Sequence, residues 1–175
     1  VKSLGGGLEN VAALRGSIAP NMKNIAEERA REEFEQKVVE AVVDRAKVEF
    51  PPILVEQGVD RLLSERESMF GGEKGVEDYL KNLNKTQEEL KEELHPVATK
   101  QLIQGLVLGK VAQEEKIEVS AADTDAEIEN LLKNAGEKGE ELQRIFGTEQ
   151  GRGWVGERLT IRKAVQRLVE IATSD

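Results

Sequence analysis

The feature that most constrains the fold is a pair of adjacent prolines, Pro51 and Pro52, between two segments with helical patterning. In residues 21–48, and again in residues 53–70, apolar side chains recur at spacings of three to five, which is typical of one face of an α-helix. Pro51 disfavours helical backbone at Phe50, and Pro52 fits the first turn of a helix, where its missing N–H is not needed. The sequence therefore predicts a rigid corner between two long helices.

The rest of the chain continues the helical pattern. Further helices are expected over residues 87–116, 121–132 and 154–172, with a glycine-punctuated loop around one short helix in residues 134–153. Thr86 with Glu89, and Ser120 with Asp123, have the spacing of N-terminal capping pairs. No stretch longer than four residues alternates apolar and polar side chains as a strand does. The predicted fold class is all-α.

Three residues within the expected helix over residues 87–116 modify it. Pro96 removes one backbone hydrogen bond and is expected to kink the helix. Gly105 and Gly109 form a GxxxG pattern in an apolar stretch. Because that stretch is too short for a membrane span, the pattern indicates close packing against another helix.

The composition excludes several partners and sites. The net charge of −9 argues against a nucleic-acid partner, because phosphate binding needs a basic surface. The chain has no cysteine, which excludes disulfides and thiolate metal sites and fits a reducing compartment. It has no apolar run of membrane-spanning length, so no membrane partner is expected. We expect a cytoplasmic protein.

The sequence offers little chemistry for catalysis. His95 is the only histidine, and a helix-surface position beside Pro96 explains it better than a metal or general-base role. The glycines of residues 71–75 lack the spacing of a phosphate-binding loop. The many paired carboxylates lie in charged helical surroundings with nothing to desolvate them. We therefore expect no catalytic residue, no metal, no cofactor and no enzymatic activity in this chain.

Large apolar residues beside glycine-rich turns are the remaining candidates for function. Such residues either pack the turn or form exposed contact points. As a set on separate helical projections, they make a plausible binding surface for apolar ligands. The candidate contact residues are Val55, Val59, Leu62, Met69, Phe70, Ile145 and Phe146.

Three segments together resemble one protein family. They are VEFPPILVEQGVDRLL (residues 48–63), TQEELKEELHPVATKQLIQGLVLGKVAQEEKIEVSAADTDAEI (86–128) and LTIRKAVQRLVEIA (159–172). Their order and spacing are similar to those of the trigger factor family of ribosome-associated bacterial chaperones. The resemblance covers residues 8–172 and concerns the C-terminal, substrate-binding domain of the family.

The resemblance implies a fold and a function. The fold would be an elongated helical body with two protruding helical arms, shared with SurA-type periplasmic chaperones. Residues 1–175 would form one chaperone domain, with residues 1–8 a flexible linker, and the family's ribosome-binding and FKBP-like prolyl isomerase domains are expected to be absent. The partners would be unfolded or nascent polypeptides, bound without ATP. The ribosome would be reached only through the absent domain, and weak self-association is expected.

Other functions stay open at this point. A helical scaffold or adaptor could use the same apolar faces for one folded partner, and a continuous apolar seam at heptad spacing would favour it. A SurA-like periplasmic chaperone is a second alternative. Dispersed apolar tips favour the chaperone for unfolded chains.

Overall fold

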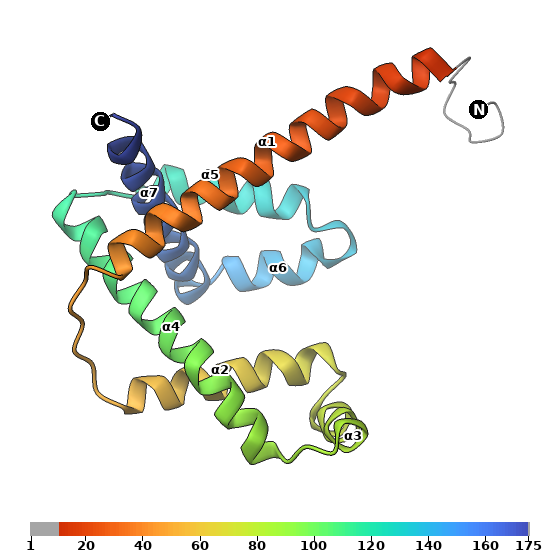
Figure 1. Cartoon of the computed structure of the whole chain (residues 1–175), viewed down its shortest axis with the longest axis vertical. Helices are drawn as coiled ribbons and strands as arrows, with labels where there is room; N and C mark the ends of the chain where they lie inside the picture. Colours follow the sequence, from red (N-terminus) through yellow and green to blue (C-terminus); the bar gives the residue numbers. More distant parts are fainter. Residues whose placement is uncertain (1–10, 175) are drawn as a thin grey trace.

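The computed structural model describes residues 11–174 and contains only helices and their connections within that range, so the chain is all-α as expected. Figure 1 shows an elongated molecule in which a long first helix crosses the top and a separate group of helices projects below. The helices are α1 (Val11–Val43), α2 (Ile53–Met69), α3 (Glu73–Leu83), α4 (Gln87–Glu114), α5 (Ala121–Lys133), the 3₁₀ turn η2 (Gly136–Lys138), α6 (Gly139–Phe146) and α7 (Glu149–Thr173). The linker expected at residues 1–8 lies outside the described residues.

The first helix both begins and ends earlier in the chain than the pattern over residues 21–48 predicts. It runs through Pro20 and ends at Val43, five residues before Val48. Only its C-terminal part packs on the body: Val39 is buried, and Glu40 accepts a hydrogen bond from Lys100 Nζ of α4 at 3.2 Å. The N-terminal half extends away from the other helices (Figure 1).

The prolines do not form a tight corner. Residues 44–52 connect α1 to α2 without a regular helix, and α2 begins directly after Pro52. Extended residues advance about 3.3 Å each and helical residues about 1.5 Å, so this connection covers the distance from the body to α2. It also brings Phe50 onto the core beside α2. The backbone carbonyls of both prolines accept hydrogen bonds from the first turn of α2, at 3.1 and 2.9 Å, as expected for a helix that starts there.

The helices α2 and α3 and the N-terminal half of α4 form one arm with its own core. The arm core consists of Val55, Val59, Leu63, Val76, Leu80, Leu90, Leu94 and Ala98. Where α2 packs against α4, a Cβ at Gly58 would lie 3.2 Å from the Ala98 Cβ. The Thr86–Glu89 capping box predicted for the start of α4 is confirmed, because each residue's backbone N–H donates to the other's side chain, at 2.7 and 3.1 Å.

The body is built around α7. The C-terminal half of α4 and the end of α1 pack on one part of α7, while α5 and α6 form a second projection that packs on another. The core of that second projection consists of Phe146, Val155 and Leu159, with five half-buried apolar neighbours. The two clusters have no residue in common.

The GxxxG segment of α4 does not make the close helix contact that the sequence indicates. A Cβ placed at Gly105 or Gly109 meets no atom within 4 Å, and both residues are exposed. The expectation of close packing is therefore wrong for the described part of the chain. Gly105 lies beyond the point where α2 and α4 touch, in the wall of a groove between them that Leu54 and Leu106 also line.

Candidate functional site

The tip of the arm is a turn that presents two large apolar residues. Met69 ends α2 and Phe70 follows it. The turn is fixed by two backbone hydrogen bonds, from the Phe70 N–H to the Arg66 carbonyl (3.0 Å) and from the Gly72 N–H to the Glu67 carbonyl (2.7 Å). Gly71 and Gly72 have φ of 79° and 106°, a region that only glycine adopts readily.

Close backbone packing fixes Phe70 but leaves Met69 free. A Cβ at Gly75 would lie 1.8 Å from the Phe70 carbonyl oxygen, so only glycine allows α3 to start this close to the end of α2. The Phe70 ring stacks on Tyr79 of α3, with ring centroids 4.6 Å apart, and Phe70 stays 41% exposed. Met69 is 82% exposed. Met69 and Phe70 together are called the arm-tip patch below.

A second turn, between α6 and α7, is built in a similar way. Thr148 caps α7: its Oγ1 accepts from the Gly151 N–H at 3.0 Å and donates to the Ile145 carbonyl at 2.7 Å. A Cβ at Gly151 would lie 2.1 Å from that same carbonyl oxygen. After this cap, α7 starts at Glu149, five residues before the predicted start at Trp154, and it includes Gly151 and Gly153, which had suggested a loop.

The α6–α7 turn also exposes large apolar side chains. Ile145 is 48% exposed and Trp154 is 51% exposed. The Trp154 ring stacks on the buried Phe146 ring at 6.3 Å between centroids, and the Arg158 guanidinium lies 5.6 Å from the Trp154 ring centroid. Ile145 and Trp154 are called the α6–α7 patch below. The sequence analysis missed Trp154, although a lone tryptophan in a chain with 3% aromatic residues is a signal that could have found it.

Burial divides the seven contact residues proposed from the sequence. Met69, Phe70 and Ile145 are exposed, whereas Val55 and Val59 lie in the arm core at 4% and 2% exposure and Phe146 in the second core at 6%. Leu62 is half-buried against the arm core. The buried side chains hold the helices together and are not accessible to a ligand in this structure. Val55 and Val59 lie on the face of α2 that packs against α4.

Two further apolar surfaces were not among the sequence candidates. Ile18, Met22 and Ile25 are exposed at spacings of four and three residues on the projecting half of α1, and are called the α1 stripe below. A groove of about 460 Å³ lies where the α1–α2 connection passes α4 and α7. Its apolar wall includes Val48, Leu106, Val107, Val111 and Leu168, and lysine and glutamate side chains stand at its rim.

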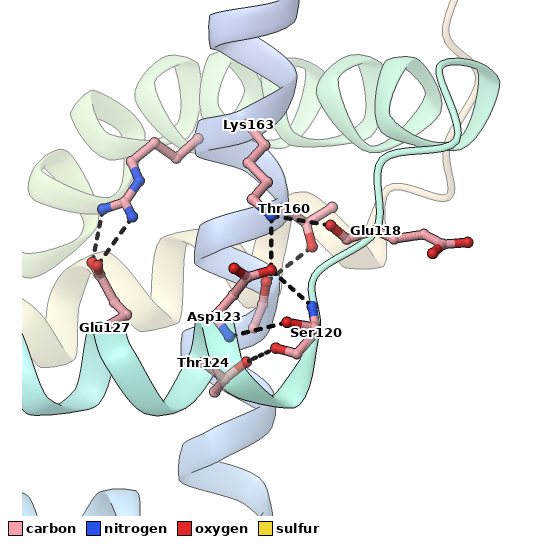
Figure 2. Close-up of polar contacts among 9 residues, drawn as sticks. Glu118, Ser120, Asp123, Thr124, Glu127, Thr160 and Lys163 are labelled. Carbon is pink, nitrogen blue, oxygen red and sulfur yellow. Dashed lines mark hydrogen bonds and ion pairs between the residues drawn. The ribbon is translucent and has the colours of Figure 1, made fainter.

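A polar network fixes α5 against α7, as Figure 2 shows. Ser120 and Asp123 form the predicted capping box at the start of α5, with hydrogen bonds of 3.0 and 3.1 Å. Lys163 of α7 reaches across and donates to Asp123 Oδ2 at 2.9 Å and to the Glu118 carbonyl at 3.1 Å. The capping box and the helix–helix contact therefore share one carboxylate.

Further ion pairs extend this network along α7. Arg162 donates two hydrogen bonds to the Glu127 carboxylate, at 2.7 and 3.0 Å. Arg167 pairs with Glu115 at 2.9 Å, and Arg152 pairs with Asp125. The basic residues of α7 thus bind acidic residues from the end of α4 through α5, which favours one orientation of the second projection.

Hydrogen bonds in this network lower the pKa of two carboxyl groups, those of Asp123 and Glu127. The hydrogen bond from Lys163, followed by those from the Ser120 backbone and hydroxyl, lowers the pKa of Asp123 from its ordinary 3.8 to about 2. The hydrogen bonds from Arg162 lower the pKa of Glu127. Both carboxylates are therefore charged at neutral pH and act as fixed acceptors in the scaffold.

The lone histidine and the acidic side chains are the groups that could bind a metal ion within the described residues. His95 lies on the arm surface, where its Nε2 is 3.8 Å from a Glu56 carboxylate oxygen. No three His, Asp or Glu side chains in residues 11–174 are grouped to hold a metal ion. Over the same residues, no helix combines the length and apolar character needed to cross a bilayer.

Comparison with known proteins identifies the family. The family model described as the C-terminus of the bacterial trigger factor protein matches residues 10–170. The chain belongs to the trigger factor family. Trigger factor from Dehalococcoides mccartyi is 30% identical over 164 residues, and that from Agathobacter rectalis is 27% identical over 165 residues. A third, from Moorella thermoacetica, is 34% identical over 126 residues.

The matches cover most of this chain but a smaller part of its relatives. The first two include 93% and 94% of this chain and 37% of each relative, and the third includes 71% of this chain and 28% of the relative. The chain therefore spans a little over a third of the length of the first two relatives. No solved structure gives a significant match.

Proposed function

We propose that this trigger factor domain is an ATP-independent chaperone module that binds exposed apolar segments of nascent or unfolded polypeptides. The observation that carries the proposal is the placement of large, exposed apolar side chains on separate, rigid turns. Met69 and Phe70 occupy the arm tip, and Ile145 of α6 and Trp154 of α7 flank the turn between these helices. An unfolded chain carries apolar side chains at intervals and can contact both patches, whereas a single compact ligand would need one continuous pocket.

The construction of the two turns supports this role. At each turn, a glycine of the second helix closely approaches a carbonyl at the end of the first, Gly75 at the Phe70 carbonyl and Gly151 at the Ile145 carbonyl. Backbone packing therefore fixes the positions of both turns, and the core stays intact beneath them. Rigid presentation lowers the conformational entropy that is lost on binding.

The charges support a protein that remains dispersed while exposing apolar surface. The net charge of −9 makes copies of the chain repel one another. We further propose that binding and release need no nucleotide, because the glycines of residues 71–75 serve to shape the arm tip. We place the protein in the cytoplasm, with ribosome contact made by other parts of the longer relatives.

An NMR titration tests the proposed function. The labelled chain is titrated with a permanently unfolded, apolar-rich polypeptide and, separately, with the folded form of the same polypeptide. We expect only the unfolded form to shift resonances, at both patches. The double variant Met69→Ser, Ile145→Ser should bind the unfolded chain several-fold more weakly. Ile171→Ser, which changes an exposed residue of α7 outside the patches, should bind as the wild type does.

The α1 stripe favours a second candidate, an adaptor for one folded partner. Its three residues, Ile18, Met22 and Ile25, form a continuous seam on one helix, and helices with such seams pair with partner helices. If the folded polypeptide or a folded cellular partner shifts only α1 resonances, and Met22→Ser abolishes those shifts, the adaptor function replaces the chaperone function.

A further inference from the structure

The sulfur chemistry of this chain is confined to two exposed side chains. The chain has no cysteine and two methionines. Met69 is 82% exposed at the arm tip, and Met22 is 65% exposed on α1. An exposed thioether can be oxidised to the sulfoxide without opening the fold, and dedicated reductases reverse the reaction. Oxidation at either position is therefore a surface event.

The arm does not depend on the Met69 side chain. The turn that follows it is held by backbone hydrogen bonds from Phe70 to Arg66 and from Gly72 to Glu67. The packing of α3 on α2 uses Gly75 and the stacked Phe70 and Tyr79 rings. A sulfoxide at Met69 would consequently change the polarity of the tip while the arm core stays as it is.

We propose that Met69 is a reversible oxidation site that lowers the affinity of the arm tip for apolar polypeptide segments, an inference that rests on the proposed function. A peroxide supplies the oxygen. With hydrogen peroxide, the O–O bond breaks, one oxygen atom forms an S–O bond with the Met69 sulfur, and the other leaves as water with both hydrogen atoms of the peroxide. The sulfur loses two electrons and the peroxide gains them. The product is a polar sulfoxide in the most exposed position of the arm-tip patch.

The direction of the effect follows from burial. A client segment that covers Met69 removes its side chain from water, which is favourable for a thioether and unfavourable for a sulfoxide without a hydrogen-bond donor opposite it. Binding of apolar segments should weaken by about threefold to tenfold. Because the rest of the patch is unchanged, some affinity should remain.

Met22 provides a matched control within the same chain. Met22→Leu leaves Met69 as the only sulfur atom, and Met69→Leu leaves Met22 as the only one. Both residues are exposed, and leucine keeps the apolar character at either position. Each variant is treated with hydrogen peroxide, and mass spectrometry verifies the addition of one oxygen atom. Far-UV circular dichroism verifies that the helices persist.

The readout is the affinity for a fluorescently labelled, permanently unfolded apolar-rich polypeptide, measured by anisotropy before and after oxidation. We expect oxidised Met22→Leu to bind about threefold to tenfold more weakly, and treatment with methionine sulfoxide reductases to restore its affinity. Oxidised Met69→Leu should bind as its reduced form does.

The possible results separate the inference from the proposed function. If both reduced variants bind and oxidised Met22→Leu binds equally well, the Met69 inference is wrong and the chaperone function stands. Loss of helix on oxidation of Met22→Leu, or weakening only in Met69→Leu, also overturns the inference. If neither reduced variant binds the unfolded polypeptide, the proposed function fails and the inference fails with it.

Discussion

Replacing the two exposed glycines of α4 by alanine should stabilise the protein. Gly105 and Gly109 have ordinary negative φ values, and a Cβ at either position meets no atom within 4 Å. The substitutions therefore change only helix propensity and the freedom of the unfolded chain, which favour alanine by about 0.5–1 kcal/mol per site. The double variant should gain about 1–2 kcal/mol. In a chain of this size, Tm rises by about 2–4 °C for each kcal/mol.

Two other glycines, at which an added Cβ would be crowded, serve as comparison sites for this measurement. Gly58→Ala would place a Cβ 3.2 Å from the Ala98 Cβ, so repulsion between α2 and α4 should cancel much of the propensity gain. Gly151→Ala would place its Cβ 2.1 Å from the Ile145 carbonyl oxygen and should destabilise the protein by about 1–3 kcal/mol.

Denaturant unfolding followed by far-UV circular dichroism measures all four changes on one scale. If the Gly105→Ala, Gly109→Ala double variant is less stable than the wild type at all protein concentrations, the added Cβ atoms collide with other atoms of the same chain, and the reasoning is refuted. If it loses stability only at high protein concentration, where copies associate, the glycines pack against a second copy, and the GxxxG pattern has the role that the sequence suggested.

Three further predictions concern the core, the capping network and the second turn. Leu94→Ala, in the arm core, should lower the free energy of unfolding by about 2–5 kcal/mol in denaturant titrations, and no loss would show that the arm adds nothing to stability. Asp123→Asn should lower Tm at neutral pH. Because the folded-state pKa of Asp123 is depressed to about 2, its stabilisation is fully present above about pH 4 and is lost as pH falls through 2, so the Tm difference from the wild type should shrink over that range. A Tm difference that stays constant from pH 4 to 2 would contradict the assignment. Thr148→Ala should cost about 1 kcal/mol through loss of the α7 cap, measured by the same denaturant titration, and an unchanged midpoint would rule out the cap as a contributor.

Local signals in the sequence predicted several features correctly. The all-α class, the start of α2 after Pro52 and the end of α2 before Gly71 follow from periodicity and backbone restrictions that act over a few residues. The capping boxes at Thr86 and Ser120 are of the same kind, because both partners lie within one helical turn. These features depend on neighbours in the chain, so the sequence contains the information directly.

Features that depend on distant segments were not predictable in this way. From the sequence, the apolar stripe on α2 that includes Val55 and Val59 could have faced either a ligand or another helix. In the structure it is covered by α4, which lies about 40 residues later in the chain. The end of α1 at Val43 was not predicted either, and the segment that follows it places Phe50 against the distant arm core. The start of α7 at Glu149 was missed because Gly151, which reads as a loop signal, is needed there for its small size.

The arm core and the core formed by Phe146, Val155 and Leu159 are separate, so the arm and the rest of the molecule can unfold or change in sequence independently. Among the helices of residues 11–174, only α4 contributes buried residues both to the arm core and to the body, through Leu94 and Ala98 at one end and Leu108 and Ala112 at the other. The arm is thus joined to the body by the continuous helix α4 and by the non-helical connection of residues 44–52. Amide hydrogens of the arm should exchange as a separate cooperative unit from those around α7. Evolution can lengthen, shorten or resurface such an arm without disturbing the packing of the body.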